Sequence, residues 1–260
     1  MNFLEAILLG IIEGLTEFLP VSSTAHLIIA SKLLNIQSTD FIKFFEIFIQ
    51  SGAILAILFL YFEKFFSNKK IILFILISFT VTSLIAIIFY KIIKNIFFEK
   101  IELIIFNLFL LGVLFIITEE FIKRKKIQLK RTLEDLSVKE SILIGFFQAL
   151  SIMPGISRAG AVILGMIVLG YKRQETVLYS FLLSVPTIIF AGLFDFYKTG
   201  LNQIYLSNQN LFYLITGFIT SFLSALLVVK WFINYLKKND LKIFGYYRII
   251  LAIILYFLFF

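Results

Sequence analysis

Residues 13–26, EGLTEFLPVSSTAH, combine two carboxylates, four hydroxyl side chains and the only histidine of the chain within a strongly apolar region. Ionisable groups at membrane depth are costly and therefore mark functional sites. Glu13 and Glu17 are four residues apart, so a helix presents both on one face. Such a pair can share protons or bind a hard divalent cation. His26 follows nine residues after Glu17 and is a candidate for proton transfer.

A proline separates these carboxylates from the hydroxyl groups. Pro20 lacks an N–H group and disfavours helical geometry before it, which predicts that a helix ends there. Ser22, Ser23 and Thr24 then provide N-cap residues for a second helix, whose free N–H groups and partial positive charge suit a phosphate. In an alternative interpretation, the carboxylates lie at the membrane interface and the hydroxyls only cap a helix. A carboxylate in mid-membrane costs about 2.5–3.5 kcal/mol, so we favour the functional interpretation.

A second broken segment spans residues 141–170, where Pro154-Gly155 interrupts an apolar run and Ser157-Arg158 follows. The guanidinium of Arg158 is permanently charged and its geometry matches phosphate oxygens. An ion pair with Glu13 or Glu17 is an alternative role for Arg158, and it does not exclude phosphate binding.

The composition is that of a polytopic membrane protein. Of the 260 residues, 60% are hydrophobic, and the mean hydropathy is +1.01. The absence of cysteine excludes disulfides and, with a single histidine, argues against a zinc site. We expect no cleaved signal peptide, because no basic residue precedes the first apolar run. The net charge of +8 lies mainly between apolar segments, which favours a topological role over nucleic-acid binding.

The apolar segments predict an all-α protein with six transmembrane helices and two re-entrant helical hairpins in a single membrane domain. Residues 6–18 would be about 20 Å long as a helix, too short to cross a hydrocarbon core of about 30 Å. We therefore expect this helix and a second one from Ser22 to about Leu34 to form a hairpin. The first repeat, residues 1–122, then comprises a hairpin at 5–34 and spans at 41–62, 71–93 and 101–122. The second repeat, residues 140–260, comprises a hairpin at 141–170 and spans at 176–197, 211–231 and 244–260.

The two halves match when one is shifted by 135 residues. Glu5 then aligns with Glu140, Gly10 with Gly145, Glu13 with Gln148 and Ser22 with Ser157. Because each half contains three spans, the halves have opposite orientations. Inverted repeats form sites where broken helices meet near the membrane midplane, so we expect the two hairpin tips to meet.

Basic residues suggest an orientation. Loops 63–70, 123–139, 171–175 and 232–243, with nearby Lys230 and Arg248, hold 17 of the 24 lysines and arginines, against 6 on the other side. This bias predicts that these loops are cytoplasmic. The first hairpin would then enter from outside and the second from inside.

The meeting point of the two tips would hold two helix N-termini, Arg158, two carboxylates and His26. This combination indicates chemistry on a phosphate group, with proton transfer and a bridging divalent ion. A site at membrane depth suits a phosphorylated lipid. Membrane lipids are the other expected partners, nucleic acid is not expected, and a homodimer is compatible with this organisation.

The chain resembles the bacterial undecaprenyl-diphosphate phosphatases, also called bacitracin-resistance proteins. The similarity includes residues 13–26, PGISRAGAV at 154–162, FEIFIQSGAILA from Phe45 and YSFLLSVPT from Tyr179, and it covers essentially the whole chain. The chain departs from the family pattern at Ala159 and Val162, where the family has serine and threonine.

The resemblance implies a hydrolase of the bacterial inner membrane that converts undecaprenyl diphosphate to the monophosphate carrier for cell-wall (peptidoglycan) synthesis. It also implies bacitracin resistance, a magnesium or calcium ion held by Glu13 and Glu17, and a site open to the periplasmic or extracellular side. By resemblance, the catalytic residues are Glu13, Glu17, Ser23, His26 and Arg158. The substrate-binding residues are Ser22, Thr24, Gly155, Ser157 and Gly160.

Two other functions are compatible with the pattern. Inverted repeats with broken helices are also typical of transporters, so a lipid-phosphate transporter or flippase is the main alternative. A scaffold that only binds a lipid phosphate is the third. Release of inorganic phosphate separates the enzyme from both.

Overall fold

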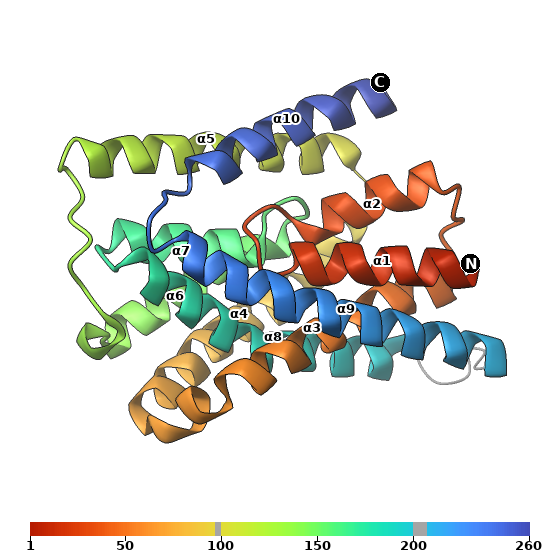
Figure 1. The fold of residues 1–260 in the computed structure, drawn as a ribbon, viewed down its shortest axis with the longest axis horizontal. Helices are drawn as coiled ribbons and strands as arrows, with labels where there is room; N and C mark the ends of the chain where they lie inside the picture. The colour runs from red at the N-terminus through yellow and green to blue at the C-terminus, as the bar shows by residue number, and fades with distance from the viewer. Residues whose placement is uncertain (97–99, 200–206) are drawn as a thin grey trace.

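The computed structural model describes residues 1–96, 100–199 and 207–260, and this part of the chain is helical, with one isolated β-bridge between Arg131 and Tyr171. Each half contains two short helices followed by three long ones (Figure 1). The first half comprises α1 (Phe3–Thr16), α2 (Ser23–Leu33), α3 (Asp40–Ser67), α4 (Lys69–Ile96) and α5 (Ile101–Lys123). The second half comprises α6 (Val138–Ala149), α7 (Arg158–Val168), α8 (Arg173–Thr199), α9 (Asn208–Tyr235) and α10 (Lys242–Phe259).

Six of these helices are long and apolar enough to cross a membrane: α3, α4, α5, α8, α9 and α10. The six predicted spans are therefore confirmed. The short helices differ slightly from the prediction, because α1 begins at Phe3 and ends at Thr16 instead of running from residue 6 to 18. Residues 17–22 form the connection that Pro20 imposes.

The 135-residue shift relates equivalent local structures. Asn2 and Glu5 form a capping box at the start of α1, and Ser137 and Glu140 form one at the start of α6. The helices after the breaks, α2 and α7, begin at Ser23 and Arg158, which is again a shift of 135 residues. The shift therefore predicts where corresponding helices begin.

The first short helix of each half packs on the opposite half of the chain. α1 packs most extensively against α9, and α6 packs most extensively against α4. Both contacts are close: a Cβ atom at Gly10 would lie 2.6 Å from the carbonyl oxygen of Gly217, and one at Gly145 would lie 2.7 Å from that of Ser78. A side chain at either glycine would therefore separate the two helices.

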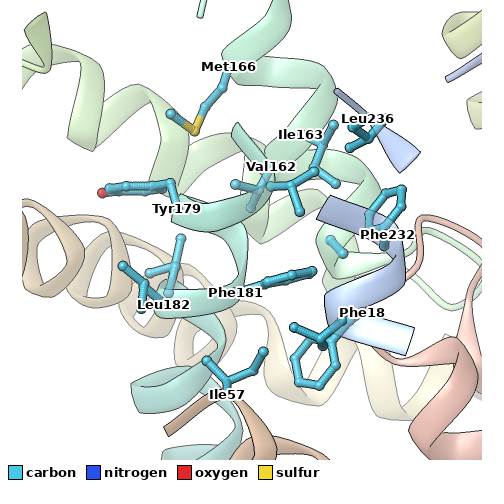
Figure 2. Packing of buried hydrophobic residues seen from close by; sticks show 14 of the residues in the cluster. Phe18, Ile57, Val162, Ile163, Met166, Tyr179, Phe181, Leu182, Phe232 and Leu236 are labelled. Carbon is cyan, nitrogen blue, oxygen red and sulfur yellow. The ribbon is translucent and has the colours of Figure 1, made fainter. Parts of the chain in front are cut away.

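The largest hydrophobic core lies directly beside the breaks in the short helices. Figure 2 shows Phe18, from the connection after α1, among side chains of α7, α8 and α9, including Val162, Phe181 and Phe232. α5 and α10 lie side by side along one edge of the molecule, and α2 lies between α10 and α1 (Figure 1). The connection after α1 and the start of α7 are thus held between a core and the α5–α10 pair.

Candidate active site

Glu17 connects three segments of the chain. Nη2 of Arg158, the first residue of α7, lies 3.0 Å from Glu17 Oε1, and the hydroxyl of Ser23, the first residue of α2, donates to Glu17 Oε2 at 2.6 Å. The side chains of Glu17 and Arg158 are 9% and 12% exposed. The two tips therefore meet, as the repeat predicted, and Arg158 forms the ion pair that was considered as its alternative role.

Glu13 lies one helical turn before Glu17 and is fully buried. Its carboxyl group interacts electrostatically with Glu17, Glu46 and Arg158. Within the described residues, no donor forms a hydrogen bond with either of its oxygens. Two neighbouring carboxylates without a donor between them repel each other unless they share a proton or a cation. The Glu13–Glu17 pair can therefore either hold a proton or contribute ligands to a divalent ion.

Gln148 occupies the position equivalent to Glu13 in the second half. It is fully buried, and its Nε2 donates to the hydroxyls of Thr82 and Thr187 at 3.0 and 3.1 Å. The amide thus makes neutral contacts between α4, α6 and α8. The two halves share a geometry, but only the first half places a carboxylate here.

The two helix N-termini at the tips differ in their capping. Ser157 caps α7, because its Oγ accepts from the backbone N–H of Gly160 at 3.1 Å, and it also lies 3.4 Å from the carbonyl oxygen of Leu19. Ser22 occupies the N-cap position of α2, as expected, but its side chain makes no capping hydrogen bond. Its φ is +73°, an uncommon conformation for a residue other than glycine. The N-cap side chain therefore satisfies a backbone N–H of α7 but none of α2.

The remaining predicted substrate-binding residues have different surroundings. Thr24 is exposed on the first turn of α2. Gly155 and Gly160 both face α5, since added Cβ atoms would lie 2.6 Å from the carbonyl oxygen of Ile104 and 3.0 Å from Leu111, respectively. Gly155 also has a φ of +88°, so it forms the turn of the second tip. Both glycines therefore bring this tip close to α5. Their backbone groups also form hydrogen bonds, since the carbonyl oxygen of Gly155 accepts from Arg248 and the N–H of Gly160 donates to Ser157 Oγ.

His26 lies on α2, one turn after Ser22. Its Nδ1 is 2.8 Å from the carbonyl oxygen of Ser22, and its Nε2 is 2.6 Å from the hydroxyl of Tyr247 on α10. The hydrogen bonds of His26 therefore do not join those of Glu17, Ser23 and Arg158. Tyr247 was not predicted as a site residue, because nothing in the sequence of the last span relates it to α2.

Arg248 corrects an expectation from the charge pattern. It was counted with the basic residues of the predicted cytoplasmic side, but it is fully buried. Its three nitrogens donate to four backbone carbonyls, those of Pro20 at 3.1 Å, Gly155 at 2.8 Å, and Asn107 and Leu108 at 3.3 Å each. One guanidinium therefore joins both tips to α5. An arginine inside an apolar span is itself a signal of function.

The two positions that depart from the family pattern lie in the core. Ala159 and Val162 are fully buried in the largest hydrophobic cluster, and Figure 2 shows Val162 beside Ile163 and near Phe181. The methyl groups at these positions thus fit their surroundings, and Ser157 and Arg158 supply the side-chain hydrogen bonds from the second tip to the first.

These features define a polytopic helical membrane protein with an arginine–carboxylate–serine site where two broken segments meet. The chain belongs to the bacitracin resistance protein BacA family, whose model matches residues 6–254. It is 40% identical to an undecaprenyl-diphosphatase of Aquifex aeolicus, with 96% of both chains covered. It is 43% identical to that of Sulfurihydrogenibium sp., covering 98% of this chain and 99% of the relative. It is 38% identical to that of Methanococcus aeolicus, covering 98% of both. The family resemblance inferred from the motifs is confirmed.

Proposed function

We propose that this protein hydrolyses undecaprenyl diphosphate to undecaprenyl phosphate and inorganic phosphate, which returns the lipid carrier to cell-wall synthesis and confers bacitracin resistance. The arrangement of Ser23, Glu17 and Arg158 is the observation that carries the proposal. A hydroxyl that donates to a buried carboxylate, itself paired with an arginine, has the geometry of an activated nucleophile beside a phosphate-binding group. Family membership and the curated names of the relatives support the same reaction.

In this mechanism, Ser23 is the nucleophile or a close phosphate ligand. As nucleophile, its oxygen bonds to the terminal phosphorus while its proton passes to Glu17 and the anhydride bond to undecaprenyl phosphate breaks. Water then cleaves the phosphoserine bond and releases inorganic phosphate. Arg158 orients Glu17 and offers its other N–H groups to the phosphoryl oxygens. The N-terminus of α2, to which Ser22 and Thr24 belong, supplies further N–H groups, and His26 transfers a proton.

We propose that Glu13 and Glu17 contribute ligands to a magnesium or calcium ion. Glu13 suits this role, because no donor among the described residues uses its oxygens, whereas Glu17 already accepts from Ser23 and Arg158. No group of three or more His, Cys, Asp or Glu residues in the described ranges could form a protein cage for a metal. This fits an ion whose remaining ligands are substrate phosphates and water, as is usual for magnesium. When bound, the ion would neutralise charge on the phosphoryl oxygens.

We further propose that the short helix pairs are re-entrant hairpins in a bacterial cytoplasmic membrane, with the site open to the periplasmic or extracellular side. The predicted cytoplasmic loops lie together: Lys70 Nζ donates to the carbonyl oxygen of Glu134, and the N–H of Lys172 donates to that of Arg131. Their high basic content supports a cytoplasmic location. The chain has no cysteine, so single-cysteine variants can report orientation. A cysteine at Ser207 should react with an impermeant reagent in intact cells, and one at Gln128 only after lysis. The reverse pattern would overturn the orientation.

The test of the reaction is phosphate release from undecaprenyl diphosphate by the purified protein in detergent, with and without chelator. Wild-type protein should release phosphate, and Glu17→Ala should not. Loss of release in chelator, restored by magnesium or calcium, would support the ion, and Glu13→Gln should raise the ion concentration required. A folded, monodisperse wild type that releases no phosphate would favour the lipid transporter, which moves its substrate intact. Light scattering on the same sample would test whether the protein is a homodimer.

A further inference from the structure

Both nitrogens of the His26 ring have a partner, and one partner determines the tautomer. Nδ1 faces the carbonyl oxygen of Ser22 at 2.8 Å. A carbonyl only accepts hydrogen bonds, so Nδ1 carries a hydrogen. In the neutral imidazole, Nε2 is then an acceptor, and the hydroxyl of Tyr247 donates to it at 2.6 Å. Nε2 is therefore the nitrogen that can take up a proton.

The hydroxyl of Tyr247 can serve both protonation states of His26. It donates to Nε2 of the neutral ring, and after a rotation of its O–H bond it can accept from Nε2–H of the imidazolium. The two rings are nearly parallel, with an interplanar angle of 2° and centroids 5.6 Å apart. Phenylalanine would keep this ring contact but offer no hydrogen bond in either state.

The rest of α10 fixes Tyr247 relative to α2. The neighbouring Arg248 holds α10 to both tips, as described above. At the far end of α2, Lys32 Nζ donates to the carbonyl oxygen of Leu258 at 3.1 Å and lies 3.4 Å from the centroid of the Phe259 ring. Between these points, Ala25 packs in a buried cluster with Leu251, Ala252 and Leu255 of α10. The contact between His26 and Tyr247 is thus part of a continuous α2–α10 interface.

We propose that Tyr247 is the positioning residue of His26, holding its imidazole in the Nδ1–H tautomer with Nε2 ready for proton transfer. This inference rests on the proposed role of His26 in the hydrolysis. It extends the functional site to α10, a helix that contributes none of the predicted catalytic residues. Tyr247 acts through the histidine and not on the phosphate, so its loss should slow turnover without weakening substrate binding.

A double-mutant cycle tests the coupling between the two residues. Tyr247→Phe should lower kcat for phosphate release about three- to tenfold, the worth of one net hydrogen bond, with KM unchanged. His26→Asn should lower kcat more, by about 100-fold. The double variant should be no slower than His26→Asn, because Tyr247 then has no imidazole to position. Tyr246→Phe is the matched control and should keep wild-type kinetics, since the hydroxyl bonded to Nε2 of His26 belongs to Tyr247 and not to this neighbouring tyrosine.

The outcomes separate the inference from the proposed role of His26. Wild-type turnover in His26→Asn would overturn both. Slow turnover in His26→Asn with a wild-type kcat in Tyr247→Phe would overturn only the role of Tyr247. An undiminished effect of Tyr247→Phe in the His26→Asn background would show a purely structural contribution, and would also overturn it.

The single histidine permits a direct measurement of the tautomer. In protein labelled with ¹⁵N-histidine, at a pH where the ring is neutral, one pair of ring-nitrogen resonances arises from His26. Nδ1 should be the protonated nitrogen, and the Nε2 resonance should shift in Tyr247→Phe but not in Tyr246→Phe. A protonated Nε2 in the neutral wild-type ring would overturn the proposal.

Discussion

Glu17 and Arg158 are 141 residues apart in the chain, yet Arg158 Nη2 lies 3.0 Å from Glu17 Oε1. This ion pair is where the two halves of the molecule share a functional site. The same guanidinium also lies 3.4 Å from the carbonyl oxygen of Ser180, so α8 helps to orient it. The pair thus depends on the packing of the tips as well as on the two charges.

Arg158→Ala should lower phosphate release about 100-fold or more, because the carboxylate loses its partner and the phosphate loses a charged donor. Arg158→Lys should retain more activity, since it keeps the charge but not the planar set of donors. The measurement is kcat/KM for both variants alongside wild type. Equal rates near the wild-type value in both variants would exclude Arg158 from the site.

Arg248→Lys should destabilise the protein by about 3 kcal/mol or more, because an ammonium group cannot replace the donors that reach four separated carbonyls. Phosphate release should fall as well, since Pro20 and Gly155 lose their common donor. Thermal unfolding in detergent measures the first effect. Lys230→Met, at an exposed cation of α9, is the control and should unfold like wild type. A wild-type Tm in Arg248→Lys would contradict the joining role of the guanidinium.

Gly10→Ala should destabilise the protein by about 1–3 kcal/mol, because the new methyl group would meet the backbone of Gly217. Gly145→Ala should do the same at the contact between α6 and α4. Gly192→Ala is the matched control: its nearest neighbour would be Ile47 at 4.0 Å, and alanine is the better helix former by up to about 1 kcal/mol. Thermal unfolding should therefore rank Gly192→Ala at or above wild type. A similar loss in all three variants would argue against the close helix contacts as the cause.

The segment between α5 and α6, which joins the two halves of the chain, should loosen in acid. Burial alone would raise the pKa of Glu140, but hydrogen bonds from Arg131, Ser137 and Tyr171 outweigh it and lower that pKa below its ordinary 4.5. A carboxyl whose folded-state pKa is lowered stabilises the fold above its unfolded value and loses that contribution as the pH falls. The pKa of Asp135 is lowered too, chiefly by the backbone N–H of Thr132, so its effect has the same sign.

A spin label on a cysteine at Gln128 can follow this change. Its mobility should rise as the pH falls below about 4.5. In Glu140→Gln the label should already be more mobile at neutral pH and should depend less on pH. A mobility that changes equally with pH in both proteins would assign the transition to other groups.

Much of the fold follows from local rules. Hydropathy predicted six spans, and the start of α2 was within one residue because a proline followed by hydroxyl residues defines it. The meeting of Glu17, Ser23 and Arg158 followed from the repeat, since the inverted arrangement brings both tips to one depth. The exact ends of α1 did not follow, because helix ends depend on capping and packing as well as on apolar periodicity.

Tyr247 and Arg248 could not be placed in the same way. They sit near the start of a span, where a tyrosine and an arginine ordinarily mark the membrane interface. Their roles arise from how α10 packs against α5 and α2. No pattern in the sequence around these two residues indicates that packing. The chemistry of histidine was enough to single out His26, but its hydrogen-bond partner, Tyr247, lies 221 positions later in the chain.

The packing of α1 and α2 on helices of the opposite half also bears on how the protein is made. α1 leaves the ribosome first, but its most extensive neighbour, α9, is among the last helices to be synthesised. α2 likewise acquires its contacts with α10 only when the chain is nearly complete. During synthesis, the nascent chain therefore holds two short segments with uncovered surfaces while α3, α4, α5 and α8 enter the bilayer. The packing of α1 and α2 is then completed late in biogenesis, and a chain that stalls before α9 leaves Gly10 and Gly14, which lie against α9 in the complete protein, on an uncovered face of α1.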